Sequence, residues 1–228
     1  MDLEICCNGL ESALIAAEAG ADRIELCTAL HLGGLTPSVE TLQSVREQIR
    51  IPVYVLIRPR SGDFVYSSKE FNTMLECVDF CISLGYDGIV SGVLSPNFTI
   101  DVERTAQLLA ASKPLDFTFH RAFDEVINPE LALAELEEIG VKRILSSGQE
   151  KSAADGLRLL QNLQSKSKQL VFMPGAGINR HNVLSFKKAG FSAVHASASK
   201  PMASDKPQNG QTVSDKEEIR AMLNIIKR

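Results

Sequence analysis

Several common functional signatures are missing from this 228-residue sequence. Its formal net charge is −4 and its lysines and arginines form no cluster, which argues against a surface that attracts nucleic acid or an anionic membrane. No apolar run approaches the length of a membrane-spanning helix. The first residues include Asp2 and Glu4 and lack the basic and apolar segments of a secretory signal. We therefore expect a cytoplasmic location, with neither nucleic acid nor a membrane as a partner.

Motifs for the best-known cofactors and nucleophiles are also absent. The sequence has no Cys-x-x-Cys or His-Glu-x-x-His spacing, no dinucleotide fingerprint and no nucleophile elbow. Its cysteines are odd in number, and without a signal they indicate reduced thiols rather than disulfides. These cysteines are Cys6, Cys7, Cys27, Cys77 and Cys81. We expect no organic cofactor.

What is present is a weak internal repeat built around four glycines. Each glycine follows an amphipathic segment and precedes a strand-like run; they are Gly20, Gly85, Gly140 and Gly190. This pattern is typical of a helix that ends in a left-handed glycine and turns into a strand. The spacings of 65, 55 and 50 residues are each about twice the βα repeat of an eight-unit barrel. The four glycines therefore mark alternate strands.

Further apolar runs lie between these four helix-to-strand connections and complete a set of eight predicted strands. The intervening strands are Leu3–Cys6, Val53–Ile57, Asp116–His120 and Gln169–Met173. Helix start signals occur at Pro37-Ser38, Ser67-Ser68 and Asn128-Pro129. Alternating strands and helices leave either a closed barrel or an open doubly wound sheet.

The closed barrel is favoured because polar groups follow nearly every strand rather than gather at one switch point. The sequence thus predicts an α/β fold, a single-domain TIM (β/α)8 barrel over residues 1–228. The segment 200–214 is polar and rich in turn-forming residues, so we expect a mobile loop there. A last helix over about 215–227 closes the barrel. Barrel enzymes use the rim at the carboxyl ends of the strands, which makes that rim the expected working surface.

Strand alternation predicts which side chains face the barrel interior. It places Glu4 and Cys6 inward on the first strand, and Glu25 and Cys27 inward on the second. Because neighbouring strands lie about 4.8 Å apart, the two thiols could hold one soft metal ion. The alternative is that both cysteines are small buried hydrophobic residues.

The third strand leads into a loop with two guanidinium groups and a carboxylate, Arg58, Arg60 and Asp63. Arginine forks bind carboxylate or phosphate groups with two parallel hydrogen bonds. The alternative is a brace between arginine and aspartate that only holds the loop.

Two histidines end predicted strands. His120 closes the fifth strand and is followed by Arg121, and His195 faces inward on the last strand. A histidine at the end of a barrel strand can act as an acid, a base or a metal ligand, although a structural role is equally open.

The loops after the last two strands predict an anion site. Gly175 and Gly177 follow the seventh strand, and Ser197 follows the eighth. In barrels these loops often bind phosphate through backbone N–H groups, although a glycine pair can also serve only to shape a turn.

Several of these segments together resemble the CutC family, known as copper homeostasis proteins. The matching segments are Glu4–Cys7, Gly20–Cys27, Gly33–Ser38, Ile57–Arg60, Gly62–Phe64, Thr118–Asp124, Ser147–Gln149, Pro174–Ile178 and His195–Ser197. The resemblance implies a TIM barrel, a cytoplasmic location and a homo-oligomer, either a dimer or a tetramer. It also implies an association with Cu(I), for which Cys6 and Cys27 are the matching thiols and Cys7 a further candidate.

Two functions follow as hypotheses. The first is a copper homeostasis protein whose partner is a copper ion bound by Cys6 and Cys27. The second is a barrel enzyme acting on a small anionic or phosphorylated metabolite. In that alternative the groups that bind the anion are Arg58, Arg60, Asp63, Arg121, Gly175, Gly177, His195 and Ser197. Glu4, Glu25 or His120 then supplies acid–base catalysis, since carboxylates in a partly dry barrel mouth can be tuned toward neutral pKa values.

Overall fold

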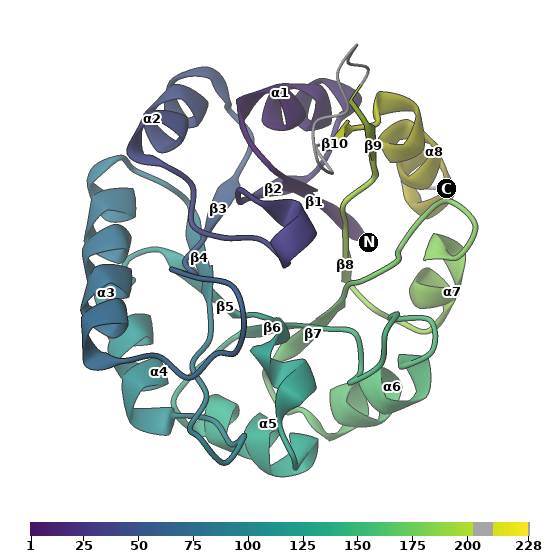
Figure 1. Ribbon diagram of the computed structural model, residues 1–228. Helices are drawn as coiled ribbons and strands as arrows, with labels where there is room; N and C mark the ends of the chain where they lie inside the picture. Colours follow the sequence, from purple (N-terminus) through teal and green to yellow (C-terminus); the bar gives the residue numbers. More distant parts are fainter. Residues whose placement is uncertain (203–211, 228) are drawn as a thin grey trace.

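Eight parallel strands form the centre of the molecule (Figure 1). The computed structural model describes residues 1–202 and 212–227. The strands are β1 (Asp2–Cys7), β2 (Arg23–Leu26), β3 (Val53–Leu56), β4 (Gly88–Ser91), β5 (Asp116–Phe119), β6 (Arg143–Ser146), β7 (Val171–Pro174) and β8 (Ala193–Ala196). Their order is β7-β6-β5-β4-β3-β2-β1-β8, and a parallel bridge between Gly175 and His195 joins the two ends. The predicted eight-stranded barrel is confirmed.

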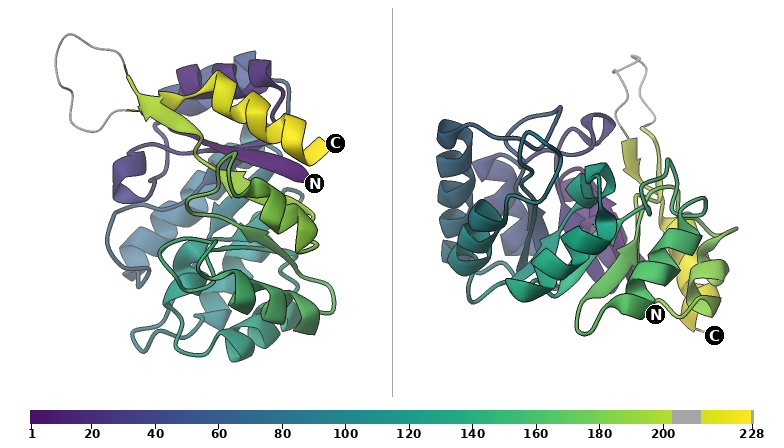
Figure 2. Two further views of the ribbon diagram at one scale, coloured as in Figure 1. Left: turned by 90° about the vertical axis from the view of Figure 1, so that its right-hand side faces the viewer. Right: turned by 90° about the horizontal axis from the view of Figure 1, so that it is seen from below.

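Helices surround this barrel on its outside (Figures 1 and 2). They are α1 (Leu10–Ala19), α2 (Val39–Gln48), α3 (Ser68–Ser83), α4 (Val102–Ala111), α5 (Pro129–Glu138), α6 (Leu157–Lys166), α7 (Val183–Lys188) and α8 (Lys216–Lys227). Two short 3-10 helices, η1 (Leu30–Leu32) and η2 (Arg121–Glu125), lie in loops that follow β2 and β5. The predicted starts are present: Ser38, Ser67 and Asn128 each accept a hydrogen bond from a first-turn N–H.

The four repeated glycines adopt the left-handed conformation that their positions require. Their φ angles are 96° at Gly20, 72° at Gly85, 92° at Gly140 and 89° at Gly190. A residue with a Cβ is strained there, whereas glycine is not. Each glycine therefore ends a helix and sets the start of the next strand, as the repeat predicts.

The apolar core is divided by the barrel wall. Outward-facing residues such as Leu3, Ile5 and Ile24 pack in the large layer beneath the helices. Inward-facing residues form separate small clusters, one of which contains Cys6, Cys27 and Leu56 with Tyr54 and Val90. The predicted alternation of β1 and β2 is thus present in the structure.

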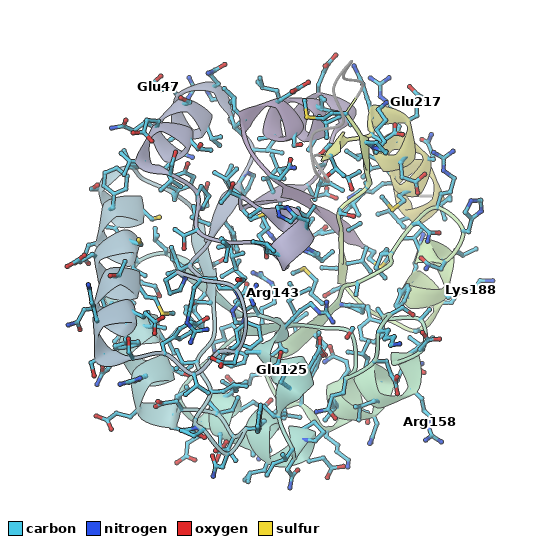
Figure 3. All side chains as sticks on the ribbon, in the orientation of Figure 1. Glu47, Glu125, Arg143, Arg158, Lys188 and Glu217 are labelled. Carbon is cyan, nitrogen blue, oxygen red and sulfur yellow. The ribbon has the colours of Figure 1, made fainter. Side chains whose placement is uncertain are left out.

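Charged and aromatic side chains fill the interior toward the amino ends of the strands. The guanidiniums of Arg23 and Arg143 lie 4.7 and 5.4 Å from the ring centre of Tyr54. The Tyr54 hydroxyl donates to Asp116, and Arg143 Nη1 donates to Thr118 Oγ1 at 3.2 Å. Figure 3 shows Arg143 near the middle of the ring of strands. This layer of side chains fills the barrel interior beneath the carboxyl ends of the strands.

The segment 200–214, for which the sequence predicts a mobile loop, differs from that prediction at both of its ends. Residues Ser199–Pro201 (β9) and Thr212–Ser214 (β10) form an antiparallel pair rather than a mobile loop. The polar composition of 200–214 hides this pairing, because the partners are separated along the chain. The rest of the predicted loop, 203–211, lies outside the described residues. Among the helices that are described, none is long and apolar enough to cross a membrane.

Candidate functional site

A cavity of about 430 Å³ opens at the carboxyl ends of the strands. The predicted site residues that line it are Cys6, Glu25, Arg58, His120, Arg121, Gly177, His195 and Ser197. The other lining residues are Leu30, His31, Gly33, Leu56, Phe64, Leu145, Ala176, Ser199 and Thr212. Glu4, Cys27, Arg60, Asp63 and Gly175 are not among them. The cavity size suits a small organic molecule or an ion.

Two thiols meet at the edge of the cavity where β1 and β2 end. Cys6 pairs in register with Glu25, and the Cys6 and Cys27 sulfur atoms lie 3.5 Å apart. Cys6 is 6% exposed and lines the cavity, whereas Cys27 is fully buried beside it. The contact with Cys27 and burial together raise the pKa of the Cys6 thiol well above its usual range.

A glycine lets the loop after β2 cover this thiol pair. Gly34 has a φ of 86°, and a Cβ placed on it would lie 2.8 Å from Leu56 Cδ2 and 3.6 Å from the Cys27 sulfur. Only glycine fits this conformation and this close approach without displacement of the neighbouring side chains. The loop therefore shields Cys27 from solvent while Cys6 stays in contact with the cavity.

A buried ion pair stands behind the thiols. Glu4 is fully buried and binds Arg23 with one carboxylate oxygen and His195 Nδ1 with the other, the latter at 2.8 Å. Burial raises the pKa of Glu4, but Arg23 and His195 outweigh that effect and lower the pKa to about 2. Glu4 is therefore an anion that orients His195, and it reaches the cavity only through that histidine.

His195 and Glu25 bring further ligand atoms to the Cys6 sulfur. One potential ligand atom from each of Cys6, Glu25 and His195 lies within 4.8 Å of the other two, and all three residues are buried. Burial raises the pKa of Glu25, and its Oε2 has no hydrogen-bond partner in the described part of the chain. Burial opposes protonation of His195, but Glu25, Cys6 and Glu4 raise its pKa well above the usual range. This cluster can hold a cation.

The part of the cavity wall that follows β3 and β5 is basic. Arg58 is 7% exposed, and its guanidinium lies 4.8 Å from the ring centre of Phe64. The ring centres of Phe64 and His120 are 4.7 Å apart. Burial, followed by the charge of Arg58, lowers the pKa of His120 to about 3. This wall therefore presents one buried cation and one neutral imidazole.

The two other arginines of the predicted anion site are paired with nearby carboxylates. Arg60 Nε lies 2.7 Å from Glu70, and Arg60 Nη2 lies 2.9 Å from Asp63. This is the geometry of the brace that the sequence left as an alternative. Arg121 lines the cavity and pairs with Asp124 at 2.8 Å. The charge of Arg121 is thus balanced locally.

The loops after β7 and β8 contribute backbone rather than charge. Gly175 forms the bridge to His195, and a Cβ placed on it would lie 2.5 Å from Leu145 Cδ1. Ala176 and Gly177 have φ angles of 88° and 73° and line the cavity together with Ser197. Gly175 is therefore required for close packing. The predicted phosphate site at Gly177 and Ser197 stays a prediction.

Sequence reasoning missed two residues that organise the site. Arg23 is the partner of Glu4, and strand alternation could have placed it inward, since it lies two residues before Glu25. Phe64 contacts both Arg58 and His120 but lies in a loop, where no periodic pattern fixes the direction of a side chain. His195 was assigned to the anion site, and the structure places it beside the thiols as well.

Comparisons with known proteins give one consistent result. The model of the family described as CutC matches residues 1–200. A CutC family protein of Salmonella schwarzengrund is 46% identical over 219 residues, which cover 96% of this chain and 88% of the relative. A CutC family protein of Salmonella typhi is also 46% identical, with 96% and 85% covered.

Solved structures agree with the sequence comparisons. A candidate copper homeostasis protein CutC from Streptococcus agalactiae superposes with a TM-score of 0.82 at 29% identity, covering 86% of this chain and 98% of that one. The thiamine phosphate pyrophosphorylase of Pyrococcus furiosus has a TM-score of 0.64 at 16% identity, covering 99% and 95%. The second likeness concerns the barrel fold alone.

Proposed function

The chain belongs to the CutC family, and from this premise we propose that it serves copper homeostasis by binding Cu(I) between Cys6 and Cys27. The observation that carries the proposal is the 3.5 Å separation of the two sulfur atoms at the edge of the cavity. Thiolates are soft ligands that select Cu(I) over harder cations. The name of the Streptococcus agalactiae protein, which refers to copper homeostasis, supports the same assignment.

The thiol pair needs little rearrangement to accept a metal ion. With metal–sulfur bonds of about 2.3 Å, two sulfur ligands at a trigonal ion are about 4.0 Å apart. The observed 3.5 Å separation therefore has to widen by only about 0.5 Å. Because the pKa of Cys6 is raised, binding must also release a thiol proton.

His195 is the best third ligand for the ion. Its Nδ1 faces Glu4, which leaves Nε2 for the side on which Cys6 lies. A carboxylate that holds the outer nitrogen of a metal-binding histidine is a common arrangement, because it fixes the ring orientation. Glu4 and Arg23 thus support the site from behind without touching the ion.

The environment of the site also fits a Cu(I) ligand set. Cys6 gives access from the cavity, and the burial of Cys27 protects it from solvent. All five cysteines of the chain are free, as thiolate binding in a reducing compartment requires. The cytoplasmic location and the homo-oligomer stay predictions that accompany this proposal.

The test is an anaerobic Cu(I) titration of the reduced protein in competition with a strong chelator. We expect one tightly bound Cu(I) per chain in the wild type and in Cys77→Ser, because Cys77 lies on α3, outside the proposed site. The double variant Cys6→Ser/Cys27→Ser should lose tight binding, and His195→Ala should bind more weakly. Removal of a ligand-orienting group commonly weakens metal affinity by about 10- to 100-fold, so Glu4→Gln should do the same.

Two results would refute the proposal. One is equal Cu(I) binding by the wild type and the double variant. The other is loss of binding in Cys77→Ser, which would move the site to a different thiol.

A further inference from the structure

The cavity wall that contains Arg58 and His120 carries a buried positive charge without a counter-ion. Arg58 Nη1 donates to the carbonyls of Leu32 and Gly34 at 3.0 and 3.2 Å, and Nη2 donates to the carbonyl of Gly62 at 2.7 Å. Within residues 1–202 and 212–227, no carboxylate lies within ion-pair distance of this guanidinium, and its Nε has no partner. Buried charges are normally paired, because removing an ion from water costs several kcal/mol.

Neighbouring groups do not remove this imbalance. The Tyr66 hydroxyl also has no partner in the described chain, and it lies close enough to Arg58 for the two side chains to interact. A neutral hydroxyl nevertheless leaves the positive charge uncompensated. Glu125 interacts with Arg58 only over a longer range, since the two form no ion pair. The guanidinium therefore remains suited to an anion that comes from outside the chain.

His120 supplies a second unused donor on the same wall. Its Nδ1 accepts a hydrogen bond from the backbone N–H of Ala122 at 3.2 Å, so the ring proton must lie on Nε2. Nε2 has no partner in the described residues, although His120 is only 4% exposed. Its low pKa of about 3 agrees with a neutral ring. His120 is thus a neutral hydrogen-bond donor on the cavity wall.

Packing holds these two groups in place. Phe64 contacts both, with 4.8 Å from its ring centre to the Arg58 guanidinium and 4.7 Å to the His120 ring centre. A Cβ placed on Gly92 would lie 2.7 Å from His120 Nδ1. The imidazole therefore packs against an aromatic ring and close to a glycine that leaves room for it. Such preorganisation favours recognition of one particular ligand group.

The charge on this wall indicates which anion fits. Arg121 is already paired with Asp124, and His120 is neutral, so only the single charge of Arg58 is available. A phosphate group carries about −1.5 to −2 near neutral pH and would be left undercompensated. A carboxylate carries one negative charge and matches the planar guanidinium fork. Leu56, Leu145 and Phe64 add apolar surface for an organic body.

We propose that the mouth of the barrel binds a small organic monocarboxylate, which pairs with the Arg58 guanidinium and accepts a hydrogen bond from His120 Nε2. Because Arg58 and His120 are both buried, side chains of the cavity wall must move locally before the carboxylate can reach them. Side-chain rearrangements of this kind are common when a ligand binds. The inference goes beyond copper binding and stands without it, because none of its groups is a proposed copper ligand.

The test uses the reduced, metal-free protein in the presence of a copper chelator, with propionate as the probe. Nitrogen-15 NMR of the side chains follows the chain's four histidines, so the His120 signal can be observed directly. We expect a saturable shift of His120 Nε2 with propionate. The neutral analogue propionamide should bind at least about tenfold more weakly, since it lacks the charge that pairs with Arg58. Inorganic phosphate should also bind more weakly than propionate.

Three variants separate this site from general effects. His120→Phe retains an aromatic ring but removes the donor, and Arg58→Lys retains the charge but removes the fork. Each should weaken propionate binding by about tenfold, as measured by isothermal titration calorimetry, since His120→Phe has no His120 signal. Arg158→Lys, on the outer face of α6 (Figure 3), should bind as the wild type does. Circular dichroism checks that each variant is folded. If a variant does not fold, the NMR titration of the wild type with propionate still tests the proposal.

The proposal is overturned by an unchanged His120 signal, which would mean that only water meets these donors. It is overturned equally by phosphate or propionamide binding as tightly as propionate. Because no copper is present in the propionate experiment, a failed Cu(I) titration would not affect its outcome. A failed propionate experiment would likewise leave the proposal of Cu(I) binding unaffected.

Discussion

At the scale of single residues, His120 shows how burial converts a titratable side chain into a fixed hydrogen-bond donor. His120 is almost fully buried and packs close to Phe64 and Gly92, and its pKa falls from 6.5 to about 3. Desolvation is the largest cause, and the charge of Arg58 adds to it. His120 therefore remains neutral over the whole physiological range.

This shift predicts a specific pH dependence of stability. Between the folded pKa of about 3 and the unfolded value of 6.5, the unfolded chain binds a proton that the folded chain does not bind. The free energy of unfolding should therefore decrease as pH falls through this window, by up to about 1.4 kcal/mol per pH unit from His120 alone. Urea unfolding of the wild type and His120→Gln across the window measures the difference.

The variant removes the titrating ring, so its stability should depend less steeply on pH. Acidic residues such as Glu4 contribute equally to both proteins and cancel in the comparison. Parallel pH profiles for the two proteins would show that His120 is not held neutral by the fold.

At the scale of elements, the start of α3 ties the cavity wall to the helical layer. Ser67 accepts a hydrogen bond from Glu70 N at 3.3 Å, and Glu70 Oε2 accepts one from Ser67 N at 2.7 Å, which completes a capping box. The other Glu70 oxygen binds Arg60. The loop that carries Arg58 and Arg60 is thus fixed to the first turn of α3.

Loss of this cap should reduce stability measurably. Ser67→Ala removes the acceptor for the first-turn N–H and should lower the free energy of unfolding by about 1 kcal/mol. Ser165→Ala, an exposed serine inside α6, is the matched control and should change it by less than about 0.5 kcal/mol. Chemical denaturation of both variants provides the measurement. Equal effects would mean that the capping box does not stabilise α3.

The elements were predictable wherever local chemistry determines the backbone. Gly20 and Gly85 require a left-handed conformation, and Ser67 and Asn128 satisfy first-turn N–H groups; these signals lie within a few residues of the feature they determine. The β9–β10 pair has no such local signal, because Ser199 meets Ser214 across a long separation in sequence. Composition alone therefore predicted a loop where the ends of that segment form strands.

At the scale of the whole molecule, the barrel gathers residues from distant segments at one rim. Strand alternation placed Glu4, Cys6, Glu25 and Cys27 inside. Cys6 and Cys27 lie in an interior cluster separate from the large outer layer, and Glu25 lines the cavity. It could not determine which way loop residues point. Arg60 faces Glu70, whereas the neighbouring Arg58 faces carbonyls of the loop after β2, and both contacts depend on tertiary packing.

The two walls of the cavity give the molecule a defined polarity. Cys6, Glu25 and His195 offer ligands for a cation, and Arg58 and His120 offer donors for an anion. The proposed binding of a metal ion to the buried thiols requires them to lose protons, so metal binding and proton release would be coupled at this rim. The proposed copper function depends on the wall that contains Cys6 and His195, and not on the wall that contains Arg58 and His120.

The most direct test of that function is X-ray absorption at the copper edge of the Cu(I)-loaded protein, beside the Cys6→Ser/Cys27→Ser variant. We predict two sulfur neighbours around the ion in the wild type, with one nitrogen neighbour from His195. Any copper that the variant retains should lack this pair of sulfur neighbours. A wild-type spectrum with only nitrogen and oxygen neighbours, or identical spectra for the two proteins, would contradict the assignment of Cu(I) to Cys6 and Cys27.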